Sequence, residues 1–117
     1  MPPPVARVDA EARDVYGNAL TASSRFEEAR SLLRKTMPVA RRVLGPSHEY
    51  WFRMKANYAR ALYLDDAATL DDLHEAVTTL AETATIARRV LGGSHPLTSG
   101  IESNLKLARR RENKFTI

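Results

Sequence analysis

One eight-residue segment occurs twice in the chain. It reads Arg41-Arg42-Val43-Leu44-Gly45-Pro46-Ser47-His48 in its first copy and Arg88-Arg89-Val90-Leu91-Gly92-Gly93-Ser94-His95 in its second, with seven of eight positions identical. Other matches on either side keep the same offset of 47 residues. These pairs are Phe26-Glu27-Glu28-Ala29 with Leu73-His74-Glu75-Ala76, Leu33 with Leu80, Ala40 with Ala87, and Asn57 with Asn104. A fixed period of this length indicates a repeat architecture in which successive units stack on one another.

Within each unit the apolar residues recur at steps of three and four, which is the spacing of one buried helix face. The long stripes contain Phe26, Ala29, Leu33, Met37, Ala40 and Leu44 in the first unit and Leu73, Ala76, Val77, Leu80, Ala84, Ala87 and Leu91 in the second. The shorter stripes contain Val8, Ala12, Val15, Tyr16, Ala19 and Leu20, then Trp51, Met54, Tyr58 and Leu62, and finally Ile101, Leu105 and Ala108. The pattern predicts five helices, at about 8–22, 25–44, 48–64, 70–91 and 96–112.

Residues that end and begin helices stand between these stripes. Gly45 and Gly92 follow the two long stripes, where a residue in the left-handed conformation usually ends a helix. Ser47 and Ser94 stand where an N-cap side chain would accept a backbone N–H of the next helix. Pro38 lies inside the predicted second helix, and because the apolar stripe continues beyond it we expect a kink there rather than a break.

The chain of 117 residues has room for one domain. We expect this domain at 8–112, with repeat units at about 8–46 and 47–93, a partial unit at 94–112, a disordered proline-rich N-terminus at 1–7 and a tail at 113–117. Roughly three repeats are usually needed for a stable stack. We therefore expect the ends of the array to be covered by self-association or by a larger assembly.

Composition excludes several classes of protein. The chain has no cysteine, so it has no disulfide, no thiolate nucleophile and no cysteine-based zinc site. No segment approaches the roughly 18 apolar residues of a membrane span, and the N-terminal Met1-Pro2-Pro3-Pro4 lacks the apolar run of a signal peptide. We therefore expect a soluble, cytoplasmic protein that does not bind membranes.

Charge is distributed unevenly along the chain, which carries a net +4. Residues 65–82 contain six acids and no base, whereas residues 41–60 contain five bases and one acid. The basic residues do not form a long stripe with interleaved aromatic residues, so the pattern disfavours nucleic-acid binding. A nucleic-acid-binding or anion-binding repeat stays as a third alternative because of the net charge and of Arg109-Arg110-Arg111.

No group of residues has the pattern of a catalytic or metal site. His48 and His95 are repeat equivalents, so we interpret them as side chains that close a turn and begin a helix. Each directly follows a serine, and sequence neighbours rarely reach nucleophile-to-base geometry. The acidic residues at 65–72 lack the glycine and the terminal glutamate of a calcium loop. We expect a non-enzymatic protein without a cofactor or a bound metal.

The repeated segments resemble the tetratricopeptide repeats of kinesin light chains. Those repeats typically read Leu-Gly-x-x-His-Pro, then Asn-Leu-Ala, then a Glu-Ala pair that opens the second helix. The matching strings here are Leu44-Gly45-Pro46-Ser47-His48 and Leu91-Gly92-Gly93-Ser94-His95-Pro96, Asn57-Tyr58-Ala59 and Asn104-Leu105-Lys106, and Glu28-Ala29 and Glu75-Ala76. Two positions depart from the pattern, because Glu49 replaces the proline and Lys106 replaces the usual small residue. The resemblance covers about residues 12–110.

This resemblance implies an all-α fold of antiparallel helical hairpins, stacked as a short right-handed superhelix of about five helices. It also implies a non-catalytic module that binds a protein or peptide on its concave face, which the first helix of each pair lines. Carried over residue by residue, the inward positions are Arg53, Asn57, Arg60 and Leu64 on the third helix and Asn104, Leu107 and Arg111 on the fifth. Side-chain amides can bind a peptide backbone and arginines can bind carboxylates, so we expect an acidic or C-terminal carboxylate ligand.

Two alternatives stay open. Asn57 and Asn104 could instead hold helices together through hydrogen bonds, with Arg53 and Arg60 simply solvated. The protein could also be a structural subunit that packs into an oligomer or a larger complex through its end helices. The stripe of Ile101, Leu105 and Ala108 discriminates, because its exposure in the isolated chain would require a further partner to cover it.

Overall fold

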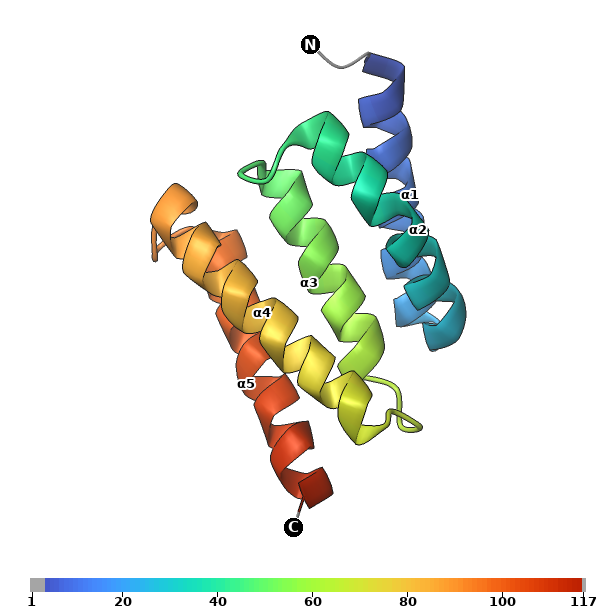
Figure 1. Cartoon of the computed structure of the whole chain (residues 1–117), viewed down its shortest axis with the longest axis vertical. Coiled ribbons are helices and arrows are strands. Elements are labelled where there is room, and N and C mark those ends of the chain that lie inside the picture. Colours follow the sequence, from blue (N-terminus) through green and yellow to red (C-terminus); the bar gives the residue numbers. More distant parts are fainter. Residues whose placement is uncertain (1–3, 117) are drawn as a thin grey trace.

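The computed structural model describes residues 4–116 of the chain, which form five α-helices (Figure 1). The helices are α1 (Pro4–Ala22), α2 (Phe26–Leu44), α3 (Glu49–Tyr63), α4 (Leu70–Leu91) and α5 (Pro96–Thr116). Residues 4–116 contain no strand. The predicted all-α fold of stacked helical hairpins is confirmed, and every helix boundary lies within four residues of its predicted position.

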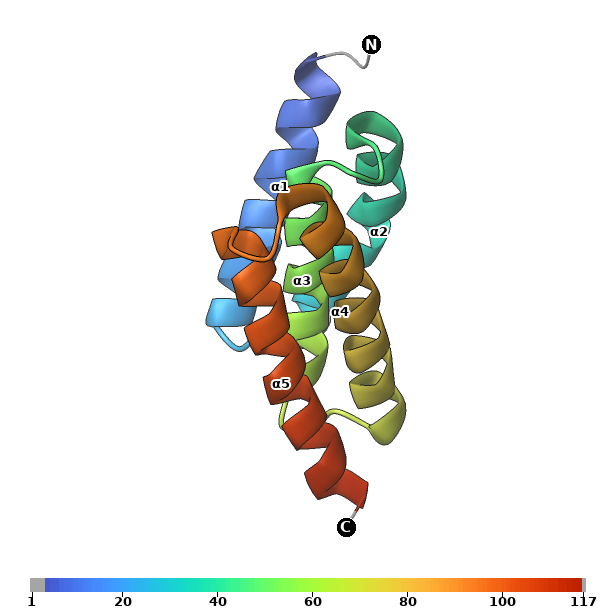
Figure 2. The same cartoon turned by 90° about the vertical axis from the view of Figure 1, so that its left-hand side faces the viewer.

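The helices pack in chain order as two layers. Each helix contacts the next one along the chain, and α3 also contacts α1 and α5. A quarter turn of the molecule shows α2 and α4 on one side and α1 and α5 on the other (Figure 2). Helices α1, α3 and α5, each the first helix of its repeat unit, therefore form a common layer. We call the surface of this layer the α1/α3/α5 face.

A single glycine follows each of the two helices α2 and α4. Gly45 has φ 91° and ψ 159°, and Gly92 has φ 93° and ψ 155°. This combination of a positive φ with an extended ψ is open essentially only to glycine. The predicted glycine ends are confirmed, but the predicted left-handed conformation is confirmed only in its positive φ, because ψ is extended at both positions.

Histidines, and not the predicted serines, begin the helices that follow. The Nδ1 atom of His48 accepts the backbone N–H of Tyr50 at 3.0 Å, and Nδ1 of His95 accepts that of Leu97 at 3.1 Å. The prediction of Ser47 and Ser94 as N-caps is wrong, because α3 and α5 each begin one residue later than a serine cap requires. The structural interpretation of the two histidines is confirmed.

Both chain ends are more helical than predicted. Helix α1 begins at Pro4, so residues 4–7 are helical rather than disordered, and proline is well tolerated in a first helical turn. Helix α5 continues to Thr116, through the predicted tail. Residues 1–3 and 117 of those predicted segments lie outside the described residues. Helix α2 continues through Pro38 to Leu44, so the proline does not break it.

The core is centred on α3, which lies between α1 and α2 on one side and α4 and α5 on the other. Phe52, Met54 and Leu62 of this helix are fully buried, together with Leu33 of α2 and Leu80 of α4. Burying an apolar side chain of this size stabilises the fold by about 1.5–3 kcal/mol. These large side chains from α2, α3 and α4 therefore join successive repeats in one core.

The apolar stripe of α5 is covered by the chain itself. Ile101 and Ala108 are fully buried, and Leu105 packs against the same core cluster. Helix α4 packs along α5, and Leu105 lies in the groove between these two helices. The stripe therefore requires no additional partner.

The predicted buried stripe of α1 is confirmed at Leu20 and is wrong at four of its other residues. Ala12, Val15, Tyr16 and Ala19 are exposed, and the side chain of Val8 lies outside the described residues. Among the residues of α1 whose burial is described, those that are buried are Ala10, Asp14, Gly17, Leu20 and Thr21. Helix α1 turns the face with these buried residues toward α2 and α3. No helix among residues 4–116 packs on the opposite face, which carries the exposed apolar residues.

Candidate functional site

Polar contacts join α1 to α3 beneath the α1/α3/α5 face. Asn57 of α3 donates from Nδ2 to Oδ1 of Asp14 in α1 at 2.9 Å, and both side chains are buried. Further along α3, Arg60 donates from Nη1 to Oδ1 of Asn18 at 3.0 Å. Both predicted binding residues therefore connect one repeat to the previous one.

A matching contact joins α3 to α5. The Tyr63 hydroxyl donates to Oδ1 of Asn104 at 2.7 Å. Burial raises the pKa of the Tyr63 phenol, although nearby Arg60 opposes the shift. The phenol therefore stays protonated and keeps its donor for Asn104. The two repeat-equivalent asparagines, Asn57 and Asn104, each bond to the preceding first helix, as the structural alternative in the sequence analysis expected.

The buried carboxyl group of Asp14 makes stability depend on pH. Its pKa is raised by burial, against the smaller opposing effects of the Asn57 hydrogen bond and the charge of Arg53. A raised pKa in the folded state means that the folded protein binds more protons than the unfolded chain just above the usual aspartate pKa. Ionising Asp14 therefore costs stability as the pH rises through its raised pKa.

We expect Asp14→Asn to be more stable than the wild type at neutral pH, because the amide keeps an acceptor for Asn57 and carries no charge. This advantage should vanish once the pH falls below the aspartate pKa of an unfolded chain. Urea unfolding at several pH values measures it. The exposed Asp9→Asn is the control, with an expected change within about 0.5 kcal/mol. A less stable Asp14→Asn at neutral pH would contradict the prediction.

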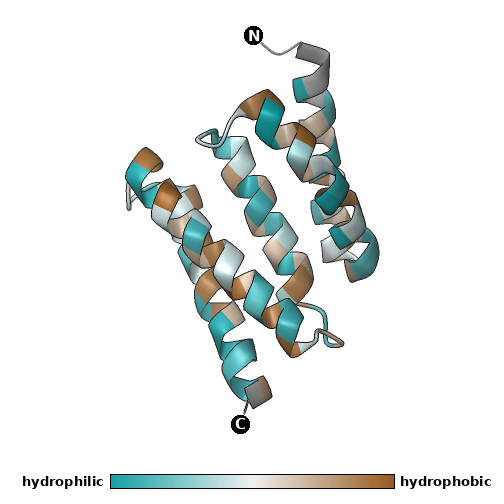
Figure 3. Ribbon diagram, in the orientation of Figure 1, coloured by the Kyte–Doolittle hydropathy of each residue, from teal (hydrophilic) through white to brown (hydrophobic). Residues whose placement is uncertain are grey.

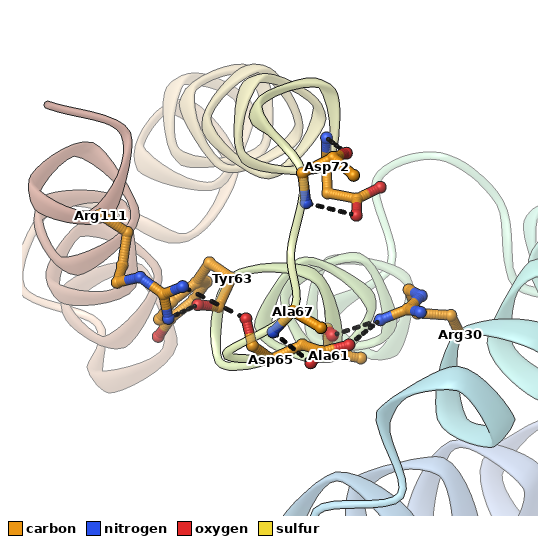
Figure 4. Close-up of polar contacts among 8 residues, drawn as sticks. Arg30, Ala61, Tyr63, Asp65, Ala67, Asp72 and Arg111 are labelled. Atoms are coloured by element: carbon orange, nitrogen blue, oxygen red, sulfur yellow. Dashed lines mark hydrogen bonds and ion pairs between the residues drawn. The ribbon is translucent and has the colours of Figure 1, made fainter. Parts of the chain in front are cut away.

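Two arginines from neighbouring helices hold the C-terminal end of α3 (Figure 4). Arg111 of α5 donates from Nη1 to the carbonyl oxygen of Tyr63 at 2.8 Å and from Nη2 to that of Asp65 at 3.2 Å. Arg30 of α2 donates to the carbonyl oxygen of Ala61 and to the Asp65 carboxylate. Because the last carbonyls of a helix lack partners within it, these guanidinium groups stabilise the helix end. Arg111 therefore has a structural role in addition to any binding role.

An apolar cavity of about 270 Å³ opens beside Arg111 at the C-terminal end of α3. Its lining residues are Tyr63, Leu64, Leu107, Arg110, Arg111 and Lys114. Leu64 and Leu107 are 37% and 44% exposed, so both leucines contribute accessible apolar surface to the cavity. The cavity combines an apolar surface with three basic side chains.

The structure brings together three of the seven predicted binding residues. Leu64, Leu107 and Arg111 meet at the cavity. Arg53 lies further along α3, exposed, with its guanidinium carbon 5.4 Å from the centre of the Tyr50 ring. The remaining three, Asn57, Arg60 and Asn104, are engaged between the helices as described above.

Sequence reasoning missed three residues of the cavity, namely Tyr63, Arg110 and Lys114. Arg110 and Lys114 follow Leu107 at helical steps of three and four, so the periodicity could have identified them. The arginine triplet of α5 does not form one patch. Arg109 instead lines a separate groove between α4 and α5, beside the Arg88–Glu102 ion pair.

Residues 4–116 offer little support for other kinds of site. No three His, Cys, Asp or Glu side chains of these residues are grouped so that they could hold a metal ion. Across the same range, none of the helices combines the length and the apolar character needed to cross a membrane.

Comparison with known proteins agrees with this geometry. The model of the tetratricopeptide repeat family matches residues 10–50, which span most of α1, all of α2 and the start of α3. No curated protein and no solved structure matches the chain. The match covers about a third of the chain, and it supports a repeat of the tetratricopeptide type, with which the all-α stack of antiparallel hairpins is consistent. Repeats of this type generally mediate contacts between proteins and are generally non-catalytic.

Proposed function

We propose that the protein is a non-catalytic interaction module that binds a partner segment on the α1/α3/α5 face, which corresponds to the concave face of longer arrays. The observation that carries the proposal is the cavity lined by Leu64 and Leu107 with Arg110, Arg111 and Lys114 around it. An apolar side chain of the partner would fill the cavity, and an acidic group beside it would pair with the basic residues.

The chemistry of the face favours an acidic ligand. Arg53, Arg110 and Lys114 are exposed on the helices of this layer, and Arg110, Arg111 and Lys114 all line the cavity. Arginine binds carboxylates in paired hydrogen bonds, and exposed leucines supply the apolar contact area that charge alone lacks. The sequence resemblance to the repeats of kinesin light chains supports a protein or peptide as the partner.

Fluorescence anisotropy with labelled peptide pools tests this proposal. One pool alternates apolar and acidic residues, and a second pool of equal length alternates apolar and basic ones. We expect the wild type to bind the acidic pool and Arg110→Glu to bind it at least about tenfold more weakly, a loss of roughly 1.4 kcal/mol. Equal affinity of the wild type for both pools would contradict an acidic ligand.

Arg42→Glu is the matched control, because it makes the same change of charge on an exposed residue of α2, outside the face. It should leave acidic-pool binding nearly unchanged at physiological salt, where distant charges are screened. An equal loss in Arg42→Glu and Arg110→Glu would show that binding follows net charge alone. It would remove the argument for the cavity.

A further inference from the structure

Helix α1 carries a copy of a surface that is buried in the other repeats. Tyr16-Gly17-Asn18-Ala19-Leu20 aligns with Tyr58-Ala59-Arg60-Ala61-Leu62 of α3, with the tyrosine, alanine and leucine identical. In α3 this tyrosine is held by both flanking helices, since its hydroxyl accepts a hydrogen bond from Arg34 of α2 at 2.7 Å and donates one to Glu75 of α4. Tyr58 is 3% exposed, whereas Tyr16 is 56% exposed.

The equivalent positions of α5 are covered as well. Leu105 and Ala108 occupy the places of Tyr58 and Ala61. Ala108 is buried in the core, and Leu105 packs against the core beside α4, whose residues line a groove with it. Each first helix therefore turns this face toward the second helix of the preceding pair. Helix α1 has no preceding pair in the described chain, so Ala12, Val15, Tyr16 and Ala19 form an exposed apolar stripe. We call these four residues the α1 stripe.

The opposite end of the stack does not match this stripe. Phe52, Ala56, Ala59, Leu62 and Tyr63 of α3 are all buried. Their equivalents 47 residues later are Ser99, Ser103, Lys106, Arg109 and Arg110, and all five are exposed. The C-terminal part of α5 is almost entirely hydrophilic (Figure 3). Stacking α5 of one copy on α1 of another would bury serines and unpaired charges against apolar side chains, which is unfavourable.

The α1 stripe is complementary to itself when two helices cross in opposite directions. Its order of side-chain size is small, large, large, small, so a two-fold axis near Val15 and Tyr16 places Ala12 against Ala19 of the second copy. The charges of α1 favour the same direction. Arg7, Asp9, Glu11, Arg13 and Asp14 all lie in its N-terminal part, and residues 15–22 carry none. A parallel pair would place like charges side by side, whereas an antiparallel pair does not.

We propose that two copies of this chain associate through their α1 stripes, antiparallel and about a two-fold axis. Such an interface is closed, because the same surface is used on both copies and no free stripe remains. One helix from each copy gives an interface at the small end of the range for specific complexes, so we expect a dissociation constant in the micromolar range. The proposal is independent of the peptide-binding face.

Sedimentation equilibrium from low micromolar to submillimolar concentration tests the proposal. The wild type should pass from monomer to dimer, and Val15→Glu should weaken association at least about tenfold. Val90→Glu is the matched control, because Val90 of α4 is 45% exposed and Val15 is 58% exposed. It should associate like the wild type, and circular dichroism should show that all three proteins are folded. A wild type that stays monomeric throughout would overturn the proposal and leave the stripe to a helix of another protein.

Cysteine cross-linking tests the direction of the pair, because the chain has no cysteine of its own. Under mild oxidation, a mixture of Ala12→Cys and Ala19→Cys should form a disulfide between the two variants faster than either variant forms one with itself. A disulfide requires closely spaced Cα atoms, and the antiparallel pair brings residues 12 and 19 together. Faster self-linking of Ala12→Cys would indicate a parallel pair and contradict the proposed arrangement.

Discussion

Replacing Phe52 with alanine is expected to lower the free energy of unfolding by about 3–5 kcal/mol. Phe52 is 1% exposed and belongs to the main core cluster. It lies in α3, which is covered by helices on both sides. Removing the ring takes away its buried apolar area and leaves a cavity that rigid neighbouring helices fill poorly. A domain of this size has roughly 5–15 kcal/mol of stability in total, so the loss is a large share of it.

Thermal unfolding followed by circular dichroism measures this effect, as a fall in Tm of roughly 10–20 °C. Ser99→Ala is the matched control, because Ser99 occupies the same repeat position in α5 and is exposed there. Its expected change is within about 0.5 kcal/mol. A similar loss in both variants would mean that the end helix is buried like α3, and it would contradict the polar end described above.

Replacing Gly92 with alanine is expected to lower the free energy of unfolding by about 1–3 kcal/mol. Gly92 has φ 93°, and a Cβ atom built there would have no other atom within 4 Å. Steric contact with the rest of the protein therefore contributes nothing to the loss. The cost comes from the backbone alone, because an alanine at this φ and ψ is strained.

Gly100→Ala is the control with the opposite expected sign. Gly100 lies in α5, is exposed, and also has no atom within 4 Å of a built Cβ. Alanine there restricts the unfolded chain and favours the helix, so stability should rise by about 0.5–1 kcal/mol. Chemical denaturation of both variants compares the two signs directly. A neutral Gly92→Ala would show that the turn does not need its positive φ.

The repeated segment allowed most of the fold to be predicted because its signals are local. Apolar residues at steps of three and four determine which face of a helix is buried, and a glycine after each long stripe determines where that helix ends. The segment also contains the histidine that begins the next helix. The sequence alone predicts Ser47 and Ser94 as the caps, because hydroxyl groups are the commoner caps and each serine directly precedes a histidine. The structure shows that the histidines are the caps.

The candidate site was less predictable than the fold. Helical spacing placed Asn57, Arg60 and Asn104 on the correct helices, but spacing does not show which polar side chains find a partner within the protein. That depends on the distance between helices that are more than 40 residues apart in sequence. For the same reason, the predicted binding residues include Leu64, Leu107 and Arg111 of the cavity but not Tyr63, Arg110 and Lys114.

The sequence by itself determined the helices, their turns and their repeat, since each depends on residues close together in the chain. Only the tertiary structure decided which apolar stripes are covered. The stripes of α3 and α5 are buried because a preceding helix packs on each, and the equivalent stripe of α1 is exposed because none of the described helices precedes it. Burial is a property of neighbours, so identical residues such as Tyr16 and Tyr58 end in opposite environments.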